Sequence, residues 1–254
     1  MSVLIPSLDR NFPSTGLTLP QMKNYFTMLG LETEFIDLAL ESQKLKKYCT
    51  ENDDIISDVV KAYNRVGLPI IAALLIYEIP YQKNPPLHAV VISGFRHKNC
   101  DVKELYIHDD QIGPYHHVKP INNKFSQWDN DWITKKKAVS VVPYKLLIPI
   151  YPKMRLNFLK IYIAYLKIKR EAEKSIKDEN LLGDMHVELF LTRINDYKEF
   201  LWGKTFDDKP KILSKPFPRF VWIIRTYYEG KPEKDYIYDG TCVYAQKLFQ
   251  INFK

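Results

Sequence analysis

The sequence predicts an α+β fold, and three observations carry this prediction. Segments with helical periodicity come first, at residues 18–30 and 53–67. Short apolar segments with the length of strands follow between residues 69 and 142, and a long amphipathic segment then begins near residue 157. Helices followed by a run of strands are typical of α+β domains. With 254 residues, of which 46% are hydrophobic, the chain is long enough to bury a sizeable core.

The first two helices are predicted by their start and stop residues. Thr18 can cap a helix that has a Pro in its first turn and ends at Gly30, and we expect a short strand over residues 31–36. The second helix begins near Asp53, whose negative charge suits the positive end of the helix dipole, and it ends at Gly67.

Four apolar segments predict the strands of one antiparallel sheet. Residues 69–76 and 89–95 are nearly continuous apolar runs, typical of strands that are buried on both faces. Residues 105–108 and 139–142 add two shorter strands. Stretches rich in Pro, Asn and Gly supply the connections, at residues 81–86, 97–101 and 111–114.

The second part of the chain predicts a smaller, associated α+β subdomain. A Pro-spaced stretch over residues 142–152 separates the two parts, so we place one domain at residues 1–150 and the subdomain at residues 151–254. The subdomain should open with a long helix over residues 157–177. The expected later elements are a strand at 187–191, a short helix at 195–202, and strands at 220–228 and 236–238.

Charge and cysteine content exclude several classes of protein. The 37 Lys and Arg against 30 Asp and Glu give a net charge of +7, which by itself does not indicate nucleic-acid binding. Cys49, Cys100 and Cys242 are far apart and fit neither a zinc site nor a disulfide framework. His116 and His117 would point to opposite faces of a strand, so we expect no metal and no cofactor.

Nothing in the sequence predicts a membrane location. The first residues carry no secretory signal, and the most apolar helical segment, residues 156–168, contains Lys160 and Lys167. We therefore expect a cytoplasmic protein with reduced thiols.

The residues most indicative of function are His88 and Asp109. His88 stands at the start of an apolar strand, and Asp109 ends the next strand. If these strands form a hairpin around residues 97–101, the imidazole and the carboxylate reach the same end of the sheet. A carboxylate there would fix the imidazole tautomer, as the orienting member of a catalytic triad does. Asp109 and Asp110 could instead form an Asx turn.

A wider pattern around these residues resembles a known family. An apolar strand after Gly-Leu-Pro, a strand beginning His88-Ala-Val-Val-Ile-Ser-Gly, and a strand ending in Asp109 before Gly-Pro-Tyr are similar to the catalytic half of papain-like cysteine peptidases. The bacteriocin-processing (double-glycine leader) peptidases are the most similar branch, and residues 14–22 add to the resemblance. The resemblance implies a papain-like helix-plus-sheet domain, with His88 as general base, Asp109 as its orienter and a polypeptide as substrate.

The nucleophilic Cys of that family, at the start of an early helix, has no counterpart in residues 1–13. Three explanations stay open. The chain lacks an N-terminal segment of a longer protein, or it has lost the nucleophile and binds without cutting. In the third, Cys242 opens a helix and supplies the thiolate, since a helix N-terminus lowers the pKa of a thiol.

Two further functions are weighed against a cysteine-peptidase activity. The same fold could act as a non-catalytic module that recognises a peptide beside His88. A basic nucleic-acid-associated protein would use Lys160, Lys167 and Lys169. The aromatic residues among these lysines are more typical of the core face of a helix, so the sequence favours a polypeptide substrate or protein partner over nucleic acid.

Overall fold

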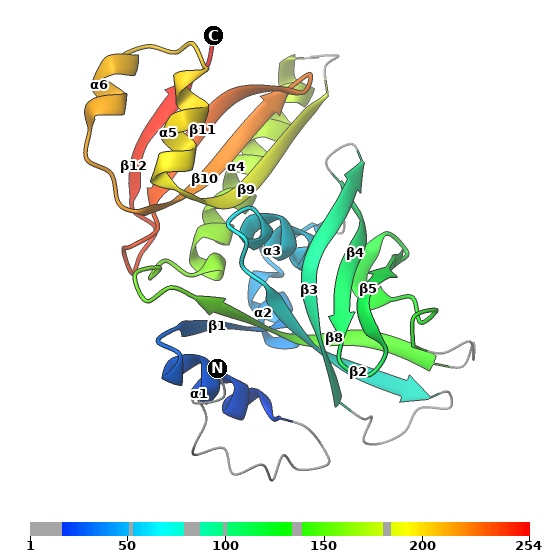
Figure 1. Cartoon of the computed structure of the whole chain (residues 1–254). Helices are drawn as coiled ribbons and strands as arrows, with labels where there is room; N and C mark the ends of the chain where they lie inside the picture. The colour runs from blue at the N-terminus through cyan, green and yellow to red at the C-terminus, as the bar shows by residue number, and fades with distance from the viewer. Residues whose placement is uncertain (1–16, 51–52, 79–86, 99–100, 134–138, 180–183) are drawn as a thin grey trace.

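The protein contains two antiparallel sheets with helices packed between and around them (Figure 1). The computed structural model describes residues 17–50, 53–78, 87–98, 101–133, 139–179 and 184–254. This arrangement confirms the α+β class.

The first sheet has eight strands and is antiparallel throughout. Along the sheet the order is β5-β4-β3-β2-β8-β7-β6, and β1 pairs with β8. The strands are β1 (Glu32–Asp37), β2 (Ile70–Glu78), β3 (Leu87–Lys98), β4 (Asp101–Asp109), β5 (Gly113–Val118), β6 (Pro120–Ile121), β7 (Lys124–Trp128) and β8 (Val139–Ile150). The predicted strands at residues 31–36, 69–76, 89–95, 105–108 and 139–142 all lie in this sheet, and most are longer than expected.

Three helices belong to this half of the chain: α1 (Leu19–Met28), α2 (Leu38–Leu45) and α3 (Ile55–Asn64). Thr18 caps α1 in a reciprocal arrangement with Gln21, as a capping box does, which confirms the predicted start. The Asp54 carboxylate caps α3 and also accepts a hydrogen bond from the Phe125 backbone at 2.9 Å. The cap of α3 is thereby tied to β7.

The second sheet has four antiparallel strands in the order β12-β11-β10-β9. They are β9 (Met185–Arg193), β10 (Phe220–Tyr228), β11 (Lys231–Asp239) and β12 (Lys247–Asn252). Helices α5 (Ile194–Trp202) and α6 (Lys209–Ser214) cover one face, and α4 (Phe158–Glu179) packs on the other, between the two sheets (Figure 1). The predicted long helix, short helix and three later strands are confirmed.

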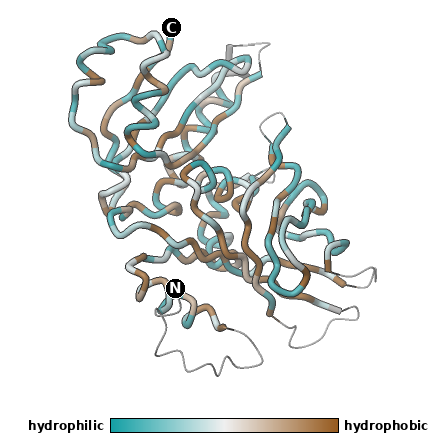
Figure 2. Tube along the Cα trace, viewed as in Figure 1, coloured by the Kyte–Doolittle hydropathy of each residue, from teal (hydrophilic) through white to brown (hydrophobic). Residues whose placement is uncertain are grey.

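The largest hydrophobic core continues across the predicted boundary at residue 150. It joins α3 and the first sheet to α4 and to the inner face of the second sheet, where Trp222 and Ile224 lie. Figure 2 shows the hydrophobic stretches mainly along interior strands, whereas the end of β3 at Lys98 and the start of β4 at Asp101 are hydrophilic. The two sheets therefore share one interior, although the chain changes sheet after β8.

The prediction that Cys242 opens a helix is wrong. Residues 240–246 form turns and bends, and the strand β12 follows them. The Cys242 sulfur instead contacts the side chains of Asp239 at 3.3 Å and Gln246 at 3.4 Å. The adjacent carboxylate raises the pKa of the Cys242 thiol, which is the opposite of what a helix N-terminus would do.

Candidate active site

The structure places the side chains of His88 and Asp109 in direct contact. β3 and β4 are antiparallel neighbours, and Val91 pairs with His108 near the end of the ladder that carries both residues. His88 Nε2 lies 2.6 Å from Asp109 Oδ2. The predicted meeting of an imidazole and a carboxylate at one end of the sheet is confirmed.

The side chain of Asp109 is fixed because each of its carboxylate oxygens has its own hydrogen-bond partners. Oδ2 faces His88, while Oδ1 accepts hydrogen bonds from the backbone of Gln111 at 2.8 Å and Ile112 at 3.2 Å. The two interpretations of Asp109, as orienter and as Asx-turn residue, are thus compatible in geometry. The residue is only 4% exposed, so water competes little for these bonds.

Electrostatics favour an ionised Asp109. Burial raises the pKa of its carboxyl group, but the hydrogen bond to His88 and those from the turn backbone outweigh burial and lower the pKa below its ordinary value. An ionised Asp109 favours the tautomer in which His88 Nε2 carries the proton. His88 Nδ1 then has its lone pair free, and no hydrogen bond within the described part of the chain uses it.

Two further groups border the pair. The ring of Trp132 lies 6.4 Å from the ring of His88, and its indole N–H donates to the Asp129 carbonyl at 3.0 Å. Asp110 is exposed, and one of its oxygens lies within 4.8 Å of the ligand atoms of His88 and Asp109.

His88, Asp109 and Asp110 are close enough together to contact a single cation. The sequence did not suggest this group, because 21 residues separate His88 from Asp109 and no metal-ligand spacing joins them. Nε2 of His88 and Oδ2 of Asp109 bond to each other, whereas Nδ1 of His88 and the Asp110 carboxylate have no hydrogen-bond partner in the described part of the chain. The geometry suits a base and its orienter better than a preformed metal centre.

Neither described cysteine takes part in this site. Cys49 lies between α2 and α3, and burial raises the pKa of its thiol. Cys242 belongs to the turn before β12 and contacts Asp239 and Gln246. Cys100 lies outside the described residues. Within the described chain, His88 therefore has no thiol as a hydrogen-bond partner.

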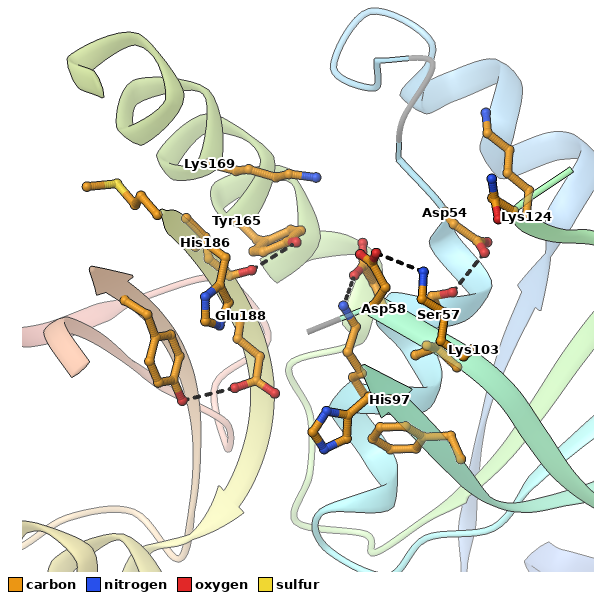
Figure 3. A pocket seen from close by; sticks show the side chains of 18 of the residues that line it. Asp54, Ser57, Asp58, His97, Lys103, Lys124, Tyr165, Lys169, His186 and Glu188 are labelled. Carbon is orange, nitrogen blue, oxygen red and sulfur yellow. Dashed lines mark hydrogen bonds and ion pairs between the residues drawn. The ribbon is translucent and has the colours of Figure 1, made fainter. Parts of the chain in front are cut away.

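A cavity of about 950 Å³ lies elsewhere, between the two sheets (Figure 3). Asp58 and Ser57 of α3 form one side, and His186 and Glu188 of β9 form another. Three ion pairs join charged groups that line it: Lys61 with Asp58, Arg65 with Glu188, and Lys103 with Asp101. Lys169 pairs with Asp53, which lies outside the lining.

Neither His88 nor Asp109 lines this cavity. Size alone would make the cavity the first candidate for a binding site. We favour the His88–Asp109 site, because its imidazole contacts a buried carboxylate that two backbone N–H groups hold in place.

The stretch proposed for nucleic-acid contact is largely engaged within the protein. Phe158, Tyr162 and Tyr165 of α4 are buried, as expected of a core face. Lys160 Nζ donates to the Val243 carbonyl at 2.6 Å, and Lys169 pairs with Asp53 at 2.5 Å. Two of the three lysines are thus occupied by intramolecular contacts, which leaves Lys167 exposed.

His116 and His117 lie on β5, as neighbours on a strand. His117 contacts Glu104 at 3.5 Å and the ring of Tyr106 at 4.9 Å, on the solvent side of β4. His116 is opposite Ile107, whose side chain is in the core. The two imidazoles face opposite sides of the sheet, as the sequence predicts.

Comparisons with protein-family models, curated proteins and solved structures find no match to this chain. None of the helices in the described part of the chain combines the length and apolar character needed to cross a bilayer.

Proposed function

We propose that the chain contains a papain-like peptidase-type domain that acts on or binds a polypeptide at the His88–Asp109 end of the first sheet. The observation that carries the proposal is the 2.6 Å contact between His88 Nε2 and an Asp109 carboxylate that is itself fixed by two backbone N–H groups. In this arrangement Nδ1 of His88 is the basic atom.

For a peptidase, the reaction would be thiolate attack on an amide carbonyl by a cysteine other than the two described ones. His88 Nδ1 would accept the proton of a thiol, and the resulting imidazolium would be stabilised by Asp109. The same proton would later pass to the leaving amine, and water would then release the acyl group from sulfur. The cytoplasm, where thiols stay reduced, suits this chemistry.

A specific observation favours a second candidate, a non-catalytic peptide-binding module. Both described cysteines contact other parts of the protein, and neither bonds to His88. The same site would then hold a polypeptide through its free imidazole nitrogen and carboxylate without cutting it.

One experiment separates the two candidates. The protein is incubated with a defined library of synthetic peptides, and cleavage is mapped by mass spectrometry for the wild type, His88→Ala and Asp109→Asn. His186→Ala is the matched control, because His186 is a half-buried imidazole that stacks on Tyr227 in the other sheet.

A peptidase loses cleavage in His88→Ala, keeps it in His186→Ala, and is blocked by a thiol-alkylating reagent. A binding module shows no cleavage, but immobilised wild type retains peptides that His88→Ala releases. If cleavage and retention are both absent, or if both are insensitive to His88, the proposed site is refuted.

A further inference from the structure

Asp110 is a charged residue at the site whose carboxylate has no hydrogen-bond or ion-pair partner in the described chain. The residue is exposed, and one of its carboxylate oxygens lies within 4.8 Å of a ring nitrogen of His88 and of a carboxylate oxygen of Asp109. No hydrogen bond or ion pair joins the Asp110 side chain to the rest of the described chain. The neighbouring Asp109, by contrast, uses both of its oxygens.

The surroundings of Asp110 combine negative charge with apolar surface. Trp132, whose ring lies 6.4 Å from that of His88, is buried and closes the core side of the site. Ile112, in the same turn as Asp110, is 42% exposed.

This combination is complementary to one kind of peptide side chain. Lys and Arg have a long aliphatic stem that packs on apolar groups and a cationic end that pairs with a carboxylate. An acidic side chain in the same position would be repelled by Asp110, which gives discrimination as well as attraction.

We propose that Asp110 is a specificity-determining residue that selects polypeptides with a basic side chain at the position next to His88. This inference rests on the proposed function, because it assumes that a polypeptide binds at the His88–Asp109 site. It adds the class of substrate that the site accepts.

The test measures binding rather than cleavage, so that it applies to a peptidase and to a binding module alike. The probes are three peptides, acetyl-Ala-Leu-Xaa-Leu-Ala-amide, in which Xaa is Lys, norleucine or Glu. Norleucine keeps most of the aliphatic stem without the charge. Dissociation constants come from titrations that follow the NMR signals of the His88 imidazole.

We expect the wild type to bind the Lys peptide more tightly than the norleucine peptide by about two- to fivefold, as for an exposed ion pair. The Glu peptide should bind most weakly. Asp110→Asn should remove the preference for Lys, and Asp110→Lys should reverse it in favour of Glu. The preference should shrink between about 0.01 M and about 1 M salt, where the screening length falls from about 30 Å to about 3 Å.

Glu229→Gln is the matched control. It removes one exposed carboxylate from the β10–β11 turn of the other sheet and changes net charge by the same amount as Asp110→Asn. A local effect of Asp110 leaves the Lys preference intact in this variant. If Glu229→Gln weakens the preference as much as Asp110→Asn does, general charge attraction explains it and the inference fails.

The inference and the proposed function fail in different ways. If all three peptides shift the His88 signals with equal affinity, and Asp110→Asn changes nothing, the specificity role is overturned while the peptide site stands. If none of the peptides shifts the His88 signals at millimolar concentration, the proposed function and the specificity role are both overturned.

Discussion

Two acid–base pairs of this protein have similar distances and different surroundings. In the second sheet, Arg225 Nε lies 2.6 Å from Asp235 Oδ1 and its second nitrogen 2.7 Å from Oδ2. Tyr197 also donates to Asp235, and the Phe200 ring lies 3.9 Å from the guanidinium carbon. In the first sheet, His88 contacts Asp109 at 2.6 Å, but Nδ1 of His88 and the whole Asp110 carboxylate have no protein partner in the described chain.

A structural ion pair and a candidate functional pair differ in whether a ligand can reach their polar atoms. Asp235 is 0% exposed and Arg225 4%, and aromatic rings surround the guanidinium, so no ligand can reach either group. The His88–Asp109 pair is equally short but lies where the sheet ends, with unused polar atoms beside it. Both pairs have a short distance and a buried carboxylate. Only the second pair has polar atoms beside it that lack a partner in the described chain.

We expect the largest effect on stability when the enclosed Arg225–Asp235 pair is broken. Asp235→Asn leaves the buried Arg225 charge without its counter-ion, and should reduce the free energy of unfolding by about 3–5 kcal/mol, measured by urea denaturation. The double variant Arg225→Met with Asp235→Leu should lose much less, because no charge is stranded. A loss below about 1 kcal/mol for Asp235→Asn would show that water reaches the pair, and the comparison would then fail.

A second enclosed carboxyl group, Glu34, makes the stability of the fold depend on pH. Burial raises its pKa to about 7, although hydrogen bonds from Tyr63 and from the Phe158 backbone act in the opposite direction. The folded state therefore holds this proton more tightly than the unfolded chain, whose value is near 4.5. Its stabilising contribution is complete below that value and is lost as the pH rises toward about 7.

The expected fall is up to about 3 kcal/mol in the free energy of unfolding between these pH values. Glu34→Gln cannot ionise, so it should flatten the pH dependence and be more stable than the wild type at about pH 8. Chemical denaturation at several pH values checks this. An unchanged slope in Glu34→Gln would contradict a protonated Glu34 in the fold.

An intermediate effect is expected at Asp109. Asp109→Asn removes the charge that His88 Nε2–H contacts, and should cost about 2 kcal/mol of stability, as for a hydrogen bond to a charged group. Because the pKa of Asp109 is lowered in the fold, its contribution is present at neutral pH and is lost as the pH falls through that lowered value.

Nitrogen NMR of the imidazole should also show a mixture of tautomers in Asp109→Asn and the Nε2–H form alone in the wild type. Asp101→Asn is the control, since this carboxylate pairs only with Lys103 on the surface. A wild-type His88 that carries its neutral-form proton on Nδ1 would sink the assignment of Nδ1 as the base.

The smallest effect on stability is expected at Asp110. Asp110→Asn should change the free energy of unfolding by less than about 0.5 kcal/mol, because the carboxylate has no protein partner to lose. Thermal or urea denaturation measures this directly. A cost above about 1 kcal/mol would mean that Asp110 serves the fold, and it would then belong with Asp235 rather than with the open site.

Much of the fold could be predicted because local patterns coincide with the tertiary arrangement. Thr18 and Gly30 bound the first helix as their types suggest, and the apolar run in β2 is largely buried. The expectation that the second apolar run is buried on both faces is wrong, because β3 buries only Val90 and Ile92 and leaves its other face toward solvent. The helix α2 was missed, because Leu38–Leu45 is short and its cap, Asp37, is also the last residue of β1. The strand β12 was missed because residues 247–252 mix polar and apolar types at an exposed edge.

Of the site, the sequence could supply the two residues but not their surroundings. His88 and Asp109 were brought together by strand pairing, which alternation and hairpin spacing predict. The contribution of Trp132 and the unused state of Asp110 depend on where two turns meet in space, which no local pattern specifies. The helix expected to begin at Cys242 does not form, because Asp239 and Gly240 build a turn that leads into β12.

The helix α4 supplies side chains to an interior that both sheets share. Gly240 fixes the segment before α4 to the second sheet. Its carbonyl accepts hydrogen bonds from Arg155 and Leu156, and its N–H donates to Phe220. A nick in the connection between β8 and α4 should therefore leave two fragments that stay associated, instead of two modules that drift apart.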